Sequence, residues 1–389
     1  MRDSTAERFA GILLNCFRII LPLLLIPVMT SCTLDLCSGT RPILKIGLAA
    51  PFEGVGRPLG YETLQGVRLA ISQWNSRGGP GGYMVELVAL NDSNDAREAR
   101  LQAEEFAVDP AVLGVIAGWS AETAEAIAPI LSQKGLATVL PWSVSPALAD
   151  PQRGIVMIAA HEGQIAQALI EHLPAAISHC NVALVGDEQA VTPYLEKLPP
   201  CAQKAAPPAA LRHDALQMWV TSLLQERTSP PEVLILVADP ISGGEIVKAA
   251  RETGWSGSLF GAVDMGSTQL LDVAGGSAEG VIIASPAPSG EDLSFRPSEI
   301  LTSLTFLTPR AVLAYDAAFV LLTAIEKSIA QEGLPSRKGV IAALPKVQID
   351  GLSGIIAFDA NGWRLRPSVW LYRIEDNRYP GTLIKQVEM

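Results

Sequence analysis

The sequence predicts an α/β protein built from two doubly wound parallel sheets. From residue 43 onward, short apolar runs alternate with amphipathic stretches of helical period, which is the pattern of βαβ units. A chain of 389 residues exceeds what one hydrophobic core usually holds. A break near residue 160 then divides the alternation into two similar series, so we expect two domains.

The first series begins with a buried strand at 44–50 and a helix at 61–77, whose apolar face carries Leu64, Val67 and Ile71. A glycine-rich turn at 78–82 follows. The same patterns predict the remaining elements, which are strands at 84–90, 112–117 and 137–140 and helices at 95–108 and 121–134.

The second series repeats this alternation, and a stretch rich in proline and serine at 285–297 then indicates a crossing. Residues 199–208, rich in proline and alanine, are expected to form a loop, and Asn361 with Gly362 a turn. We expect helices at 163–173, 192–198, 216–225, 243–253, 310–331 and 337–344, and strands at 181–185, 233–237, 258–261, 280–284, 354–359 and 368–374.

The amino terminus has the features of an export signal. Arg2 and Arg8 precede an apolar run at 19–29, and small residues follow it. Cys32, directly after Thr30 and Ser31, resembles the lipidated cysteine of bacterial lipoproteins. The alternatives are an ordinary signal peptide or an uncleaved membrane helix at 9–29, which Arg18 disfavours because a charge at mid-bilayer is costly. Each alternative places the rest of the chain outside the cytoplasm.

The net charge of −11 disfavours nucleic acids and anionic membrane surfaces as partners, because both attract basic proteins. Cys180 and Cys201 flank a predicted strand and helix. In an oxidising compartment they form one disulfide, or else they remain two buried thiols. The four histidines show no metal-ligand spacing, and we expect neither a metal nor a cofactor.

The motifs of common enzymes are missing from the sequence. Gly54, Gly56 and Gly60 lie between a strand and a helix, but their spacing is one residue too long for a dinucleotide fingerprint. Ser120, Ser143 and Ser145 follow strands without a nucleophile elbow or a histidine placed as a base. These absences predict a protein that is not an enzyme and has no catalytic residues.

Two strand–helix junctions carry the candidate binding chemistry. Ligands of doubly wound sheets collect at the carboxyl ends of the strands, where helix N-termini present free N–H groups. Residues 118–123 and 141–146 offer hydroxyls, backbone donors and the indoles of Trp119 and Trp142, which suit a carboxylate joined to an apolar or aromatic group. The alternative is that Ser120 caps a helix and the tryptophans pack in the core.

Several segments of the chain resemble the leucine/isoleucine/valine-binding family of periplasmic solute-binding proteins, which have the type I periplasmic binding protein fold. The resemblance covers nearly the whole chain after the signal. It rests on residues 46–54 as the opening strand and cleft loop, on 66–71 with 75–79 as the first helix and its turn, on 135–148, on 314–317, and on 354–362 as the closing signature.

The resemblance implies two Rossmann-like lobes joined by three hinge crossings, which close on a ligand without a chemical step. Lobe 1 would comprise residues 43–159 with 286–362, and lobe 2 residues 160–285 with 363–389. Residues 1–31 would be the signal peptide and 32–42 a tether.

The resemblance also implies which residues bind. Lobe 1 would hold a ligand carboxylate and lobe 2 a ligand amine. In lobe 2, Asp264 lies beside the family's acid position, while Val191 and Asp239 replace common tyrosines. Asp239 has a second interpretation, as the cap of the following helix. The implied lobe 1 residues are Ser120, Ala121, Glu122, Thr123, Trp142, Ser143 and Val144.

We therefore expect an extracytoplasmic receptor, anchored by lipid on Cys32, for an amino acid or a related amine or carboxylate. It would act as a monomer and deliver its solute to an ABC permease in the membrane. The alternatives are a ligand-sensing receptor component on the same fold, an exported α/β hydrolase, and a pair of lobes that has lost binding.

Overall fold

The computed structural model describes residues 41–173, 179–208, 213–225, 230–293 and 307–389. The predicted signal peptide, Cys32 and nearly all of the tether lie outside these residues. Residues Ile43–Met389 form one compact unit. In the described part of the chain, no helix is both long and apolar enough to span a membrane.

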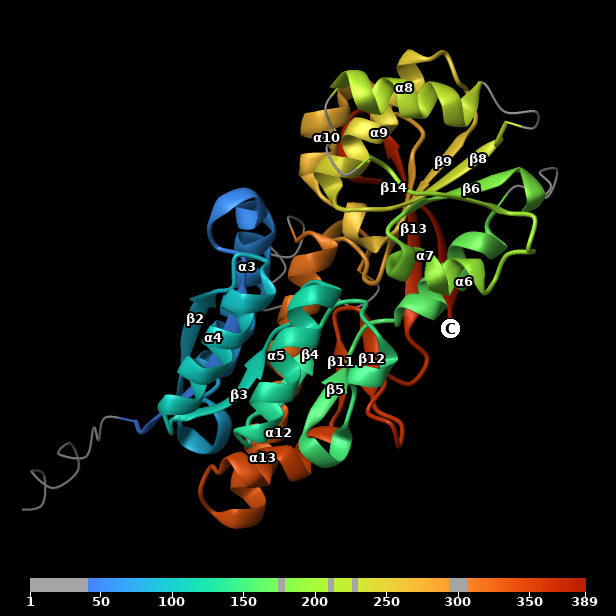
Figure 1. The fold of residues 1–389 in the computed structure, drawn as a ribbon. Helices are drawn as coiled ribbons and strands as arrows, with labels where there is room; N and C mark the ends of the chain where they lie inside the picture. The colour runs from blue at the N-terminus through green and yellow to red at the C-terminus, as the bar shows by residue number, and fades with distance from the viewer. Residues whose placement is uncertain (1–40, 174–178, 209–212, 226–229, 294–306) are drawn as a thin grey trace, which may run out of the picture. The chain divides into compact units, whose positions relative to one another are not determined.

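The first sheet has five parallel strands (Figure 1). Its order is β2-β1-β3-β4-β5, so the chain moves outward from β1 first in one direction and then in the other, as in a doubly wound sheet. The strands are β1 (Ile43–Ala50), β2 (Met84–Asn91), β3 (Val112–Ile116), β4 (Ala137–Leu140) and β5 (Ile155–Met157).

Helices α3 (Arg57–Ser76) and α12 (Pro309–Glu332) pack against each other, although more than two hundred residues separate them in the sequence. Gly66 permits the contact, because a Cβ there would lie 2.0 Å from the carbonyl oxygen of Ala311. The other helices around this sheet are α4 (Ala96–Val108), α5 (Ala121–Gln133) and α13 (Arg337–Ala343).

The second sheet has seven strands in the order β14-β13-β10-β9-β8-β6-β7. Five of them are parallel and repeat the winding of the first sheet, whereas β13 and β14 add an antiparallel edge. The strands are β6 (Val182–Gly186), β7 (Gln203–Ala205), β8 (Val233–Val237), β9 (Ser258–Gly261), β10 (Ile282–Ser285), β13 (Ser368–Glu375) and β14 (Arg378–Glu388).

A disulfide joins Cys180, just before β6, to Cys201, just before β7. It therefore ties two neighbouring parallel strands of the second sheet to each other. The helices of this half are α6 (Glu162–Glu171), α7 (Glu188–Leu195), α8 (His213–Leu224), α9 (Pro240–Glu252) and α10 (Thr268–Ala274).

A buried polar network fixes the hairpin of β11 (Gln348–Gly351) and β12 (Gly354–Ala357). Asp316 of α12 accepts hydrogen bonds from the backbone N–H groups of Leu352 and Ser353 and from the Ser353 hydroxyl. The guanidinium of Arg364 donates to carbonyl oxygens of Ile158, Ser353 and Ile355 and to the Ser353 hydroxyl. Segments far apart in the sequence are thereby held together where the first and third crossings are predicted.

The predicted elements have counterparts in the structure, with corrections at several ends. Helix α3 begins at Arg57 rather than at 61, because Pro58 occupies its first turn, where a proline fits. Helix α7 begins at Glu188 rather than at 192, since an acidic residue favours the first turn. Strand β12 ends at Ala357, and the predicted loop at 199–208 contains β7. Strands β5, β11 and β14 and helix α10 were not predicted.

Candidate functional site

The candidate site is built around Trp142, which follows β4 of the first sheet. Its indole nitrogen donates a 2.7 Å hydrogen bond to Asp264 Oδ1, in the turn after β9 of the second sheet. Trp142 is 1 % exposed, whereas Asp264 is exposed to solvent. A second bond joins Gln269 Nε2 of α10 to the carbonyl oxygen of Val55, at 2.7 Å. The two sheets are thus connected through groups at the carboxyl ends of their strands.

Arg310, the second residue of α12, covers the ring of Trp142. Its guanidinium carbon lies 3.6 Å from the Trp142 ring centroid and 5.8 Å from that of Trp119. The centroids of the two indole rings lie 6.3 Å apart. A guanidinium so close to an indole face makes a cation–π contact that is strengthened by exclusion of water, and Arg310 is only 2 % exposed.

Acidic groups lie near this cation, but no ion pair with it occurs among the described residues. Glu62 of α3 accepts a 2.9 Å hydrogen bond from the hydroxyl of Thr308, the residue that caps α12. Burial raises the pKa of Glu62, and the charge of Arg310 opposes that rise. Solvent reaches Asp264, but the protein groups that crowd its carboxylate desolvate it and raise its pKa, while the Trp142 hydrogen bond and the Arg310 charge act in the opposite direction.

Further titratable groups face Asp264 from the second half of the chain. Desolvation and the nearby charge of Asp264 raise the pKa of Glu162, at the start of α6, to about 7. Burial raises the pKa of Tyr194 of α7, and the charges of Asp264 and Glu162 add to the effect. The surroundings of Asp264 are therefore acidic, and they favour a positively charged group of a ligand over a negative one.

The first predicted junction caps a helix. Ser120 precedes α5 and exchanges hydrogen bonds with Thr123, so that each side chain accepts from the backbone N–H of the other residue. Ala121 begins the helix, and Glu122 is exposed on its first turn. Ser120 is thus the N-cap of α5, which was the alternative interpretation. A role in binding for Ser120, Ala121, Glu122 and Thr123 remains a prediction.

The other predicted site residues differ in burial and in their partners. Ser143 is buried next to Trp142, and its hydroxyl has no hydrogen-bond partner among the described residues. Val144 and Val191 are fully buried in hydrophobic clusters. Asp239 is exposed and caps α9, accepting hydrogen bonds from the N–H groups of Ile241 and Ser242. It also lies near enough for its charge to raise the pKa of Asp264.

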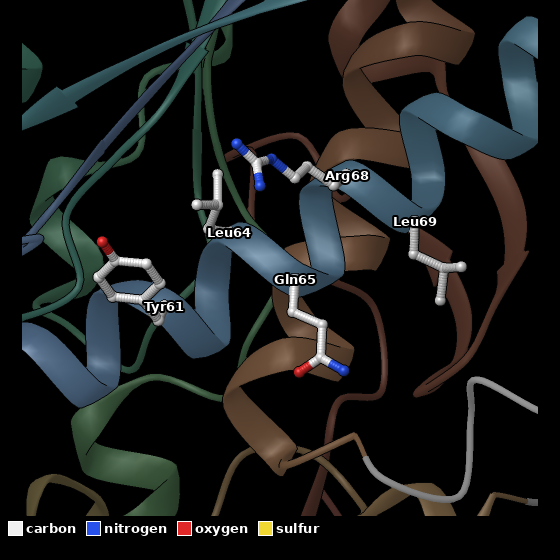
Figure 2. Close-up of a pocket in the computed structure, with 5 residues that line it drawn as sticks. All are labelled: Tyr61, Leu64, Gln65, Arg68 and Leu69. Atoms are coloured by element: carbon white, nitrogen blue, oxygen red, sulfur yellow. The ribbon is translucent and has the colours of Figure 1, made fainter.

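Two of the pockets formed by the described residues lie away from these side chains. One, of about 440 Å³, is lined by Tyr61, Leu64, Gln65, Arg68 and Leu69 of α3, which Figure 2 shows side by side on that helix. The other, of about 600 Å³, contains Asp292, Arg364 and Glu388 among its lining residues. Neither pocket is lined by any of the binding residues that the sequence predicts.

Arg310 is the residue that the sequence analysis missed. The helix around it was predicted from its apolar positions, and a single basic residue adds nothing to that pattern. One signal was available, since a cation in the first turn of a helix opposes the helix dipole and therefore needs another reason to be there. The face of the Trp142 indole, which the sequence analysis offered to an apolar or aromatic group of a ligand, is covered by the protein's own arginine.

The architecture defines a class of protein. Two Rossmann-like sheets present the carboxyl ends of their strands to a shared set of polar and aromatic groups, as in proteins that hold a small molecule between two lobes. A binding role of this kind needs no nucleophile or metal. Among the described residues, no three His, Cys, Asp or Glu side chains are grouped to hold a metal ion.

Comparison with known proteins identifies the family. The sequence model described as "Periplasmic binding protein" matches residues 43–378. The leucine-specific-binding protein of Salmonella typhimurium is 21 % identical over 256 residues, which cover 64 % of this chain and 69 % of that protein.

Solved structures have the same fold. The leucine-binding protein LivK of Thermotoga maritima superposes with a TM-score of 0.75 at 19 % identity, covering 88 % of this chain and 98 % of that one. LivJ of Streptococcus pneumoniae, a branched-chain amino acid transporter substrate-binding protein solved with isoleucine, also gives 0.75, at 16 % identity and with 89 % and 99 % covered.

The chain belongs to the periplasmic binding protein family. Its fold is the predicted type I fold with two Rossmann-like lobes, and this prediction is confirmed. Members of this family bind solutes outside the cytoplasm, so the chain is a binding protein and not an enzyme.

Proposed function

We propose that this protein is the solute receptor of an ABC importer for an amino-acid-like molecule, which it captures between its lobes and delivers to a membrane permease. The bond from Trp142 to Asp264 carries the proposal, because it brings the strand ends of both sheets together at one polar group. A solute placed there would contact both lobes only when they are closed, and so would stabilise the closed form.

The relatives support the class of solute. Proteins with this fold are named for leucine or for branched-chain amino acids, and one was solved with isoleucine bound. In this chain the exposed carboxylate of Asp264, in its acidic surroundings, is suited to accept an ammonium group.

We further propose that lipid on Cys32 holds the receptor at the membrane. The support is the sequence of residues 1–32, in which an apolar run and small residues precede the cysteine. The acidic net charge leaves the lipid as the attachment, because an acidic protein is not drawn to an anionic membrane surface.

A ligand screen followed by one isosteric substitution tests binding. Amino acids, polyamines, betaines and aromatic acids are screened for an increase in Tm, which a ligand raises by binding the folded state. Asp264→Asn keeps an oxygen to accept the Trp142 hydrogen bond but removes the charge. We expect it to weaken the best hit at least tenfold, about 1.4 kcal/mol, in calorimetry.

Asp272→Asn, at an exposed position on α10, is the matched control and is expected to bind normally. Equal affinity in Asp264→Asn and Asp272→Asn would remove Asp264 from the binding site. A full screen without a single stabilising compound would contradict the proposed function.

A further inference from the structure

Arg310 has too few hydrogen-bond acceptors for a buried guanidinium. It is 2 % exposed, and its one hydrogen bond to the described residues is a long one, 3.4 Å from Nη1 to the carbonyl oxygen of Trp119. Its Nε is buried and has no partner within the described part of the chain. A buried charge whose N–H groups lack acceptors is costly, and each such group calls for an explanation.

Arg364 shows how the same fold satisfies an arginine that is purely structural. It is 6 % exposed, and its guanidinium makes four hydrogen bonds of 2.8–3.2 Å to the protein. Both arginines lie near acidic side chains, but Arg364 has four hydrogen bonds to the protein where Arg310 has one long one. The described part of the chain therefore leaves donors of Arg310 unsatisfied, which it does not do at Arg364.

Two further polar groups in this part of the molecule also lack hydrogen-bond partners. The indole N–H of Trp119, 3 % exposed, and the hydroxyl of Ser143, 8 % exposed, are likewise buried without partners among the described residues. Trp119 contacts Arg310 directly, and Ser143 follows Trp142, on which the guanidinium stacks. An unpaired indole N–H beside a cation that lacks acceptors is the complement of an anion with several acceptor oxygens.

The stacking of Arg310 leaves its hydrogen-bonding edge available. A planar guanidinium uses its face for the aromatic ring and its N–H edge for an acceptor, and a carboxylate matches this edge with two parallel hydrogen bonds. Glu62 does not fill this place, because its carboxylate accepts a hydrogen bond from the hydroxyl of Thr308. Asp264 accepts from Trp142 instead.

We propose that Arg310 binds the carboxylate of the solute and makes a carboxylate group a requirement for binding. The inference rests on the proposed function and narrows its class of solute. Trp142 then separates a cation that binds the carboxylate from an acid, Asp264, that binds the ammonium. Because Trp142 and Asp264 contact each other here, the solute reaches Arg310 when the two lobes part.

Sets of compounds that differ in the carboxylate or in the amine test whether binding requires a carboxylate. The twenty L-amino acids, their amides, putrescine, and the amine-free acid 4-methylpentanoate are compared by thermal shift, and Kd is measured for each hit by tryptophan fluorescence. We expect stabilisation by amino acids and none by amides or by putrescine. Arg310→Gln is expected to weaken the best amino acid at least tenfold, and Arg310→Lys to weaken it less.

Two further variants separate binding from folding. Glu62→Gln/Arg310→Gln removes both charges together, so that no carboxylate is left buried beside a missing cation, and it should fold and still fail to bind. Arg251→Gln is the control, because Arg251 also stacks on an indole, 5.5 Å from Trp255, on α9. It should bind like the wild type.

An amide or putrescine that binds as tightly as the amino acid would overturn the inference and leave the proposed receptor function standing. Unchanged affinity in both Arg310 variants would overturn it as well. If no compound of any set binds, the proposed function fails and the inference fails with it.

Discussion

Arg310 illustrates how one side chain alters the chemistry of a site that the sequence predicted in outline. The positions of Trp142 and Asp264 at strand ends followed from the βαβ pattern, and the structure brings them together. The contact with Arg310 depends on packing between residues far apart in the sequence, which a local pattern does not contain. The sequence therefore predicted an aromatic surface for a ligand where the structure has an arginine.

Asp92 at the end of β2 gives the clearest dependence of stability on pH. It is fully buried, Oδ2 has no partner among the described residues, and desolvation raises its pKa to about 6. A raised carboxyl pKa favours the folded state at low pH, so the free energy of unfolding falls as the pH rises from about 4 through 6.

We predict that Asp92→Asn removes this pH-dependent fall in the free energy of unfolding. The amide stays neutral, and its oxygen can still accept a hydrogen bond from the Asn94 N–H. The gain at pH 8 should be at most about 3 kcal/mol, and it should vanish at pH 4. Urea unfolding at both pH values measures it. Asp272→Asn serves as the exposed control, and an equal gain in both variants would show that Asp92 is not the cause.

At the scale of elements, α5 allows capping to be separated from binding. Ser120 caps the helix, and removing such a cap costs about 1 kcal/mol. We predict that Ser120→Ala lowers the free energy of unfolding by this amount, whereas Ser120→Asn, also a good cap, restores it.

Binding by the same variants decides the second role of Ser120. If its hydroxyl contacts the solute, as the resemblance implies, both substitutions weaken binding, although only the alanine lowers stability. Affinity that follows stability across the two variants would assign Ser120 to capping alone.

Two of the strands that the sequence missed, β7 and β14, lack a detectable pattern of apolar residues. Strand β7 (Gln203–Ala205) has three residues, lies at the edge of its sheet, and is surrounded by prolines and alanines, so it has no apolar alternation to detect. Strand β14 has no buried residue and mixes polar with apolar residues without a clear period of two. The buried central strands were predicted, because a strand covered on both faces is a continuous apolar run.

At the scale of the whole molecule, the two-lobe fold was predictable because each half repeats the same local pattern. The boundaries of the lobes, at residues 159, 285 and 362, remain a prediction. The Asp316–Ser353–Arg364 network lies at the third of these predicted crossings, and its contact with Ile158 lies at the first. Such contacts are not visible in a sequence, since they join isolated polar residues from distant segments.

The proposed lipid anchor predicts where the protein is found in the cell. We expect Cys32→Ser to move it from the membrane fraction to the soluble exported fraction, because no lipid can then be attached. Fractionation and immunoblotting measure the distribution, with Cys37→Ser as the matched control. Retention of Cys32→Ser in the membrane would favour an uncleaved helix at 9–29 instead.

The bond between Cys180 and Cys201 has a consequence for how the protein is produced. Thiol-reducing systems of the cytosol keep such cysteine pairs reduced, so the disulfide forms only after export from the cytosol. A recombinant preparation recovered from cytosol would then be a mixture of oxidation states. Protein for calorimetry should therefore be produced by secretion, or its cysteines should be oxidised after purification. In either case mass spectrometry should confirm that the disulfide has formed.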